Sequence, residues 1–162
     1  MQRKTLLTII VSLIAMFALL ALHTLDVTST GAKMGFKTIS KGVWSGHTSQ
    51  SYYVIQDADE WARVWNEHQQ IFTPQRSPPD IDFSEATVIA VFMGQCPTTG
   101  YSIEVREVID TGLAVIVKVE KTYPGRGCIV GEALTNPYHI VQTGKISRNV
   151  IFEFSTRTVN CG

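Results

Sequence analysis

The second half of the chain alternates between short apolar runs and turns, and this pattern restricts the fold more than any other feature. Residues 86–94, ATVIAVFMG, form a continuous apolar run, which is typical of a central strand buried on both faces. Residues 101–109, YSIEVREVI, alternate between apolar and polar, as a strand with one buried face does. In the run that follows, we expect Leu113 to face the core together with the alternate valines after it. Turn sequences such as DTG and YPGRGC separate the three remaining strand-like runs: LAVIVKVEK (113–121), PYHIVQT (137–143) and NVIFEFST (149–156).

One segment of the first half breaks this pattern and predicts a helix. Residues 57–72, DADEWARVWNEHQQIF, begin with Asp57, which is suited to cap a helix N-terminus. Two strand-like runs, at 36–44 and 51–56, precede the segment. Together the patterns predict a mainly β fold, an antiparallel β-sandwich or half-closed barrel with one packed α-helix. The helix carries one stripe of large side chains, which we expect to dock onto a sheet: Trp61, Val64, Trp65, His68 and Phe72.

An uncharged apolar tract stands at the start of the chain. It runs from Leu6 to Leu25, about 30 Å as a helix at roughly 1.5 Å per residue, which is enough to span a bilayer. Arg3 and Lys4 precede it and favour a cytoplasmic N-terminus. The tract is longer than the core of a typical signal peptide, and the small-residue sites after it are poor cleavage sites. We therefore expect an N-terminal transmembrane helix, and leave cleavage open as the alternative.

This interpretation divides the chain into three parts. Residues 1–25 form the anchor or signal segment, residues 26–35 a polar tether, and residues 36–162 the folded domain. The domain is expected to face outside the cytoplasm, attached to the membrane, or to be secreted if the first segment is cleaved. The formal net charge of zero provides no field for binding nucleic acid.

Export to an oxidising compartment changes what the three cysteines indicate. Cysteines in such a compartment more often form disulfides than metal sites or reactive thiolates. Cys96 and Cys128 each lie beside a turn rich in glycine and proline, so we expect these two to pair. Cys161, one residue from the end of the sequence, is then left over.

No catalytic motif is present in the sequence. It has no G-x-S-x-G elbow, no H-E-x-x-H pair, no C-x-x-C and no phosphate-binding loop. A zinc site from Cys96, Cys128 and His139 would match no common ligand spacing, and nothing orients a dyad of Cys96 with His139. His68 is expected to be a buried core imidazole. We therefore expect no catalytic residue, metal or cofactor. The four histidines are scattered along the chain: His23, His47, His68 and His139.

An ordered set of segments resembles the PrcB family of protease-complex subunits. It spans about Gly42 to Val141 and comprises DADEWARVWNEH, PPDIDFSEATVIAVFMG, PTTGYSIEV, YPGRG and ALTNPYHIV. The resemblance implies a non-catalytic partner that associates with an exported serine protease and supports its assembly or maturation. The sequence departs from the family's pattern in lacking a lipidation cysteine after the apolar tract and in carrying Thr99, Cys96 and Cys128.

A second, local resemblance concerns CPTTGYSIEV, which is similar to a loop of the chagasin-type inhibitors of cysteine proteases. It implies three clustered loops that enter a protease cleft, with residues 97–101 on the first, 125–127 on the second, and Pro137 and Tyr138 on the third. Turns held rigidly on a sheet present hydrogen-bonding groups and aromatic side chains to a partner. The partner would be an exported protease or another extracytoplasmic protein. We predict that these residues bind it: Pro97, Thr98, Thr99, Gly100, Tyr101, Arg126 and Tyr138.

Overall fold

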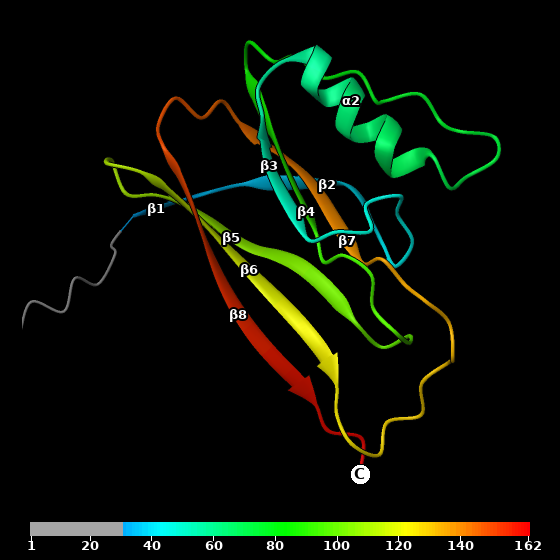
Figure 1. Cartoon of the computed structure of the whole chain (residues 1–162). Coiled ribbons are helices and arrows are strands. Elements are labelled where there is room, and N and C mark those ends of the chain that lie inside the picture. Colours follow the sequence, from blue (N-terminus) through cyan, green and yellow to red (C-terminus); the bar gives the residue numbers. More distant parts are fainter. Residues whose placement is uncertain (1–30) are drawn as a thin grey trace, which may run out of the picture. The chain divides into compact units, whose positions relative to one another are not determined.

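The computed structural model describes residues 31–162, which form two four-stranded sheets and one helix (Figure 1). The expected mainly β fold with one packed helix is confirmed. The hydrogen-bonded strands form two separate sheets, so the fold is a sandwich rather than a half-closed barrel. The helix is α2 (Ala58–Gln69), and the strands are β1 (Ala32–Met34), β2 (Phe36–Gly42), β3 (Ser51–Ile55), β4 (Ala86–Phe92), β5 (Ser102–Asp110), β6 (Val115–Pro124), β7 (Tyr138–Gly144) and β8 (Val150–Val159).

The order of the strands corrects one expectation. One sheet has the order β1-β5-β6-β8 and the other β2-β7-β4-β3. All pairs are antiparallel except β6 with β8, which run parallel. The prediction of an antiparallel sandwich is therefore wrong at this edge. After β6 the chain crosses to the other sheet as β7 and returns as β8. Because the chain reverses direction twice, β8 lies beside β6 and runs parallel to it.

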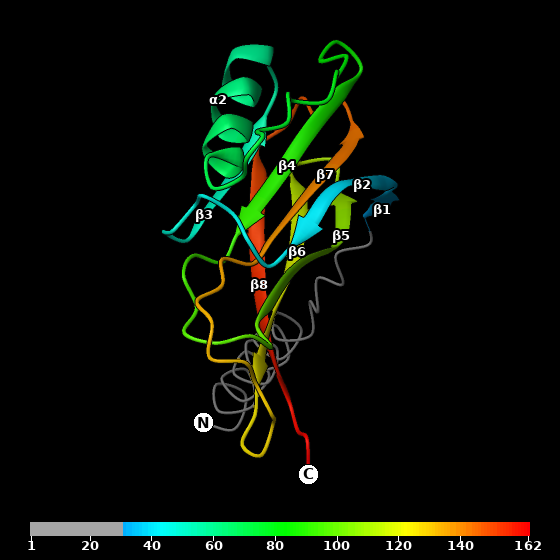
Figure 2. The same ribbon diagram turned by 90° about the vertical axis from the view of Figure 1, so that its right-hand side faces the viewer.

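Strand β4 is buried along its whole length, as its continuous apolar run predicts. Ile89 and Val91 face the core between the two sheets, whereas Val88, Ala90 and Phe92 face the helix. Residues 31–162 therefore form three layers, with α2 outside the β2-β7-β4-β3 sheet and the second sheet on its other side (Figure 2). Each layer covers an apolar face that would otherwise be in water.

Helix α2 begins and packs as its sequence predicts. The Asp57 side chain caps it by accepting the Glu60 N–H at 2.8 Å. Trp61 and Trp65 are buried, and their indole N–H groups donate to the carbonyls of Pro79 and Arg76 at 2.9 and 2.8 Å. The two tryptophans thus dock the helix on the sheet and also hold the proline-rich loop that follows it.

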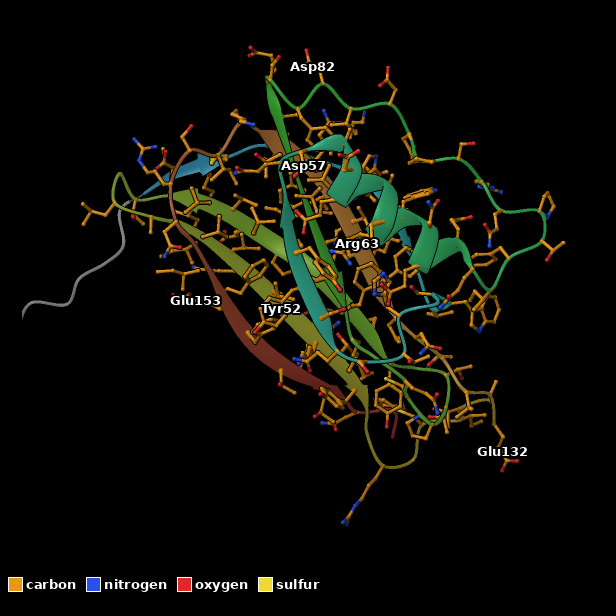
Figure 3. All side chains as sticks on the ribbon, turned by 45° about the horizontal axis from the view of Figure 1, so that its top comes forward. Tyr52, Asp57, Arg63, Asp82, Glu132 and Glu153 are labelled. Carbon is orange, nitrogen blue, oxygen red and sulfur yellow. A yellow bond between two sulfur atoms is a disulfide. The ribbon has the colours of Figure 1, made fainter. Side chains whose placement is uncertain are left out.

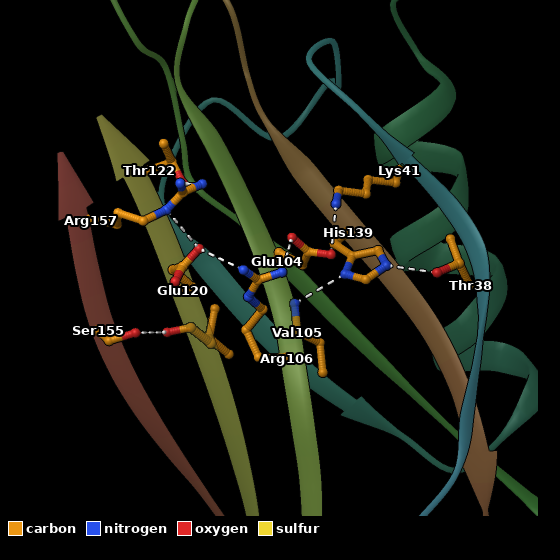
Figure 4. Close-up of polar contacts among 11 residues, drawn as sticks. Thr38, Lys41, Glu104, Val105, Arg106, Glu120, Thr122, His139, Ser155 and Arg157 are labelled. Carbon is orange, nitrogen blue, oxygen red and sulfur yellow. Dashed lines mark hydrogen bonds and ion pairs between the residues drawn. The ribbon is translucent and has the colours of Figure 1, made fainter. Parts of the chain in front are cut away.

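His139 on β7 links the two sheets from inside the sandwich. Its Nδ1 accepts the Val105 N–H of β5 at 3.0 Å, beside a bulge between Val105 and Glu107. The neutral ring then carries its proton on Nε2, which donates to Thr38 Oγ1 on β2 at 2.9 Å (Figure 4). Burial lowers the pKa of His139 to about 4, with a smaller contribution from Lys41. Both ring nitrogens are occupied, so His139 has no site left to accept a proton from Cys96.

The structure also revises the edges of the predicted segments. Residues 32–34, assigned to the tether, form β1 and pair with β5, and Met34 packs against the core between the sheets. Leu113 is 91% exposed rather than buried, since it lies in the turn before β6 and not in the strand. The expected anchor at 1–25 and residues 26–30 of the tether lie outside the described residues. Within residues 31–162, no helix has the length and hydrophobicity needed to cross a membrane.

Candidate functional site

Three loops meet at one end of the sandwich, and we call residues 43–50, 93–101 and 125–137 the loop end. Backbone hydrogen bonds join the loops: the Asn136 N–H donates to the carbonyl of Val43 at 2.7 Å, and the Gln95 N–H to that of Thr48 at 2.9 Å. Figures 1 and 2 both show the segment after β4 lying beside the long connection from β6 to β7. The predicted turn at 96–101 is therefore one part of a larger bonded surface.

The turn at 96–101 is held on both sides. Cys96 and Thr135 exchange backbone hydrogen bonds at 2.7 and 3.0 Å, as in a short antiparallel bridge. The Thr99 N–H donates to the Gly131 carbonyl at 3.0 Å, and Thr99 Oγ1 accepts the Gly131 N–H at 2.7 Å. Thr135 Oγ1 donates in turn to the Thr98 carbonyl at 2.9 Å. The side chains of Thr99 and Thr135 therefore bind the turn to the neighbouring loop and do not form a phosphate-binding loop.

Gly100 completes the turn with a φ of 92°, a conformation that favours glycine. A Cβ at this position would lie 3.1 Å from Cβ of Pro124 and 3.2 Å from Cγ1 of Val130. The glycine thus allows both the turn and the close approach of the loop before β7.

We expect Gly100→Ala to lower the free energy of unfolding by about 1–3 kcal/mol, because the side chain is strained at this φ and crowded by its neighbours. Gly112→Ala is the matched control, since Gly112 has a φ of 82° with no atom within 4 Å of an added Cβ. Denaturant unfolding of both variants separates backbone strain from crowding. Equal losses in the two variants would show that the contact with Pro124 and Val130 contributes nothing.

The predicted pairing of Cys96 with Cys128 is wrong. Cys128 forms a disulfide with Cys161, because the parallel strands β6 and β8 end side by side, with Pro124 opposite Val159. Cys96 has a free thiol, and its side chain is buried in the core between the sheets. Burial raises the pKa of the Cys96 thiol, against a smaller lowering by Lys121. A buried, protonated thiol is poorly suited to act as a nucleophile.

The remaining predicted binding residues lie in three different environments. Tyr101 is half-buried and packs edge-on against Tyr123, with ring centroids 5.6 Å apart. Arg126 is exposed at the tip of the connection from β6 to β7. Tyr138 is buried at the start of β7, where its hydroxyl bonds Ser40 Oγ at 2.9 Å. The third exposed loop implied by the chagasin resemblance is therefore not formed by Pro137 and Tyr138, since Pro137 is buried and β7 begins at Tyr138.

Three large apolar side chains on the loop end are open to solvent, and none of them is among the binding residues predicted from the sequence. Trp44 is 55% exposed, Leu134 is 61% exposed and Ile129 is fully exposed. Trp44 was assigned to a strand, but β2 ends at Gly42. One feature of the sequence could have indicated their exposure: they lie in glycine-containing segments in which apolar and polar residues do not alternate. Such exposed side chains, grouped on connected loops, mark candidate interaction surfaces.

The loop at 43–50 is fixed to the helix by buried polar groups. The Gly46 N–H donates to the His68 carbonyl at 3.0 Å, and His47 Nε2 donates to the Val64 carbonyl at 3.1 Å. Ser45 Oγ lies 3.0 Å from His68 Nδ1. His68 is a buried core imidazole, as expected, and burial together with neighbouring His47 lowers its pKa to about 4. Trp44 therefore stands on a backbone that cannot move freely.

The chemistry available at the loop end is that of recognition. Its ordered backbone presents exposed apolar side chains and a cation, and Cys128 is bonded to Cys161 rather than placed beside Cys96 and His139. In the part of the chain that the structure describes, no group of three or more histidine, cysteine or acidic side chains is placed to hold a metal ion.

The family comparison bears directly on this region. Residues 87–143 match the model of the family described as PrcB C-terminal, which confirms the resemblance over those residues. The match begins in β4 and ends in β7, and it includes two of the three loops of the loop end. No curated protein and no solved structure shows a significant match to the chain.

Proposed function

From this match we propose that the chain is a non-catalytic, membrane-tethered subunit whose loop end binds an exported protease and supports its assembly or maturation. The single observation that carries the binding site is the exposure of Trp44, Ile129 and Leu134 on loops that are hydrogen-bonded to one another. Their solvent-exposed surface would be buried in a complex.

The distribution of side chains favours the loop end over the outer face of the β1-β5-β6-β8 sheet. That face carries a chain of ion pairs, in which Arg106 bonds Glu104 and Glu120, and Arg157 also bonds Glu120 (Figure 4). Charged residues are depleted at the centre of protein interfaces, whereas tryptophan and arginine are enriched. The loop end offers Trp44 as an aromatic anchor and Arg126 as a cation.

Rigidity is the second property that suits the loop end for binding. The Gly125 N–H donates to the Val159 carbonyl at 2.8 Å, and the Cys128–Cys161 disulfide lies next to it. The 96–101 turn is bonded to Gly131 and Thr135. A surface that is already ordered loses less conformational entropy when it binds.

Substitution of the exposed apolar residues should weaken partner binding without affecting the fold. We expect Trp44→Ala and Leu134→Ala each to reduce recovery of a crosslinked protease from native membranes, and to weaken its measured affinity at least about tenfold. Tyr52→Ala is the control, because Tyr52 is 48% exposed but lies on β3, outside the loop end (Figure 3). Thermal unfolding measures the stability of each variant, because Tyr52→Ala also removes ring contacts with Phe152 and Phe154 at 4.8 and 5.3 Å between centroids.

The results of these binding experiments distinguish an accessory subunit from an inhibitor. Loss of protease capture in Trp44→Ala and Leu134→Ala, but not in Tyr52→Ala, supports the loop end as the binding surface. A protease that matures only when the subunit is present supports the accessory role, whereas one whose activity falls on adding the subunit would identify an inhibitor. Recovery of no protease with the unaltered chain contradicts the proposal.

A further inference from the structure

A pocket of about 420 Å³ lies between the C-terminal end of α2, the loop that follows it, and the adjoining ends of β2 and β7. Its size falls within the range of small-molecule sites, roughly 300–1,000 Å³. The helix and the loop are seen in Figure 1. Its lining residues are Ser40, Trp65, Gln69, Phe72, Thr73, Pro74, Arg76 and Tyr138.

The polar groups in the pocket are fixed and include the amide of Gln69, whose nitrogen opens onto the pocket. Gln69 is 6% exposed, and its Oε1 accepts the Arg76 N–H at 3.1 Å. This bond fixes which way the amide is oriented and leaves Nε2 as its free donor. Nε2 donates no hydrogen bond to any residue from 31 to 162. No buried side-chain nitrogen or oxygen among the described residues lacks a partner, so this nitrogen is accessible from the pocket and is free to donate to a ligand acceptor.

The other polar groups that line the pocket also provide more hydrogen-bond donors than acceptors. Ser40 Oγ and Tyr138 Oη lie 2.9 Å apart, and since one donates to the other, one hydroxyl proton of the pair remains for a ligand. Arg76 forms no ion pair with any described residue. The lining residues include no aspartate or glutamate.

The carbonyl groups at the C-terminal end of α2 do not offset the positive character of the pocket. Carbonyls of its last turn accept N–H groups, His68 from Gly46 at 3.0 Å and Gln69 from Phe72 at 2.9 Å. They are therefore not bare acceptors that would repel an anion. The apolar walls are aromatic, formed by Trp65, Phe72 and Tyr138.

We propose that this pocket binds a carboxylate carried on an apolar, preferably aromatic, body. The body packs against Trp65, Phe72 and Tyr138, and the carboxylate accepts from Gln69 Nε2 and pairs with Arg76. Two sources share this chemistry: a free aromatic carboxylic acid and the C-terminus of a peptide that ends in an aromatic residue. The proposal goes beyond the protease-binding function, since it concerns different residues and a different ligand.

The test is calorimetric titration of the full-length chain in detergent with 3-phenylpropionate and its uncharged amide. We expect the acid to bind saturably with a Kd below about 1 mM, and the amide about tenfold more weakly, because it loses the charge-assisted bonds. Arg76→Gln should weaken acid binding about tenfold. Arg63→Gln, which removes an exposed cation of α2 that does not line the pocket, should change it less than about twofold (Figure 3).

A peptide of four alanines and a terminal phenylalanine, with a free or amidated C-terminus, distinguishes the two sources. Tighter binding of the free-acid peptide than of 3-phenylpropionate supports a peptide C-terminus, and weaker binding supports a small acid. Absence of saturable binding of both acids up to about 10 mM would overturn the proposal. Equal affinity for acid and amide, or unchanged affinity in Arg76→Gln, would overturn it as well.

Discussion

Lowering the pH from 7 to 4 should destabilise the fold by about 3 kcal/mol for each of His68 and His139. The pKa of each is about 4 in the folded chain, against 6.5 as the ordinary value. Between these values the unfolded chain binds more protons, so the stabilisation is complete above pH 6.5 and is lost as the pH falls toward 4. The combined loss, about 6 kcal/mol, is comparable with the whole stability of a small domain.

Burial is the main cause of both pKa shifts, and the groups around each ring determine the rest. His68 faces Ser45 Oγ and the ring of His47, and a charge on His47 would lower its pKa further. His139 lies near Lys41, which lowers its pKa, and Glu104, which raises it. A proton on Nδ1 of His139 would also break the bond from the Val105 N–H that joins the sheets.

Urea unfolding at a series of pH values between 7 and 4 measures the effect. His139→Gln is the control variant, because a glutamine amide can accept from Val105 and donate to Thr38 without titrating. Between pH 7 and 4 its unfolding free energy should fall by about 3 kcal/mol less than that of the unaltered chain. An NMR titration of the histidine rings gives the folded pKa values directly. Values near 6.5 for both rings would contradict the prediction.

Loss of the disulfide should have the second-largest effect. Cys161→Ser removes a bridge between residues 33 positions apart, which on the chain-entropy model stabilises the fold by roughly 3–4 kcal/mol. Cys128→Ser should have a similar effect, and the double variant should be no less stable than either single one, because both residues contribute to one bond.

The control is Cys96→Ser, which breaks no bridge. Reductant should lower the melting temperature of the unaltered chain and of Cys96→Ser, and leave that of Cys161→Ser unchanged. Peptide mapping without reduction should recover Cys128 linked to Cys161. A peptide that links Cys96 to Cys128, or reductant sensitivity in Cys161→Ser, would show that a different bridge is formed.

Local patterns in the sequence were sufficient to predict individual elements. Asp57 and the stripe that includes Trp61 and Trp65 predicted α2, because capping and helical spacing depend on residues within four positions of one another. The unbroken apolar run of β4 predicted a strand with both faces buried, since a strand with a solvated face would alternate. Contacts of this kind involve near neighbours in the chain.

The candidate site depended on contacts between distant residues. The pairing of Cys128 with Cys161 follows from the return of β8 beside β6, and the burial of Tyr138 follows from the position of α2 over β7. Trp44 became a candidate only when the 43–50 loop proved to be bonded to α2 and to Asn136. None of these relations has a local sequence signature.

By itself, the sequence determined the class of the fold, its helix, its central strand and the resemblance to PrcB, because each of these is written in local periodicity or in ordered motifs. Only the tertiary structure decided which cysteines pair, which loops meet, and which large apolar side chains remain in solvent. Burial and pairing depend on how strands are ordered in a sheet, and many orders are compatible with the same alternation of apolar and polar residues.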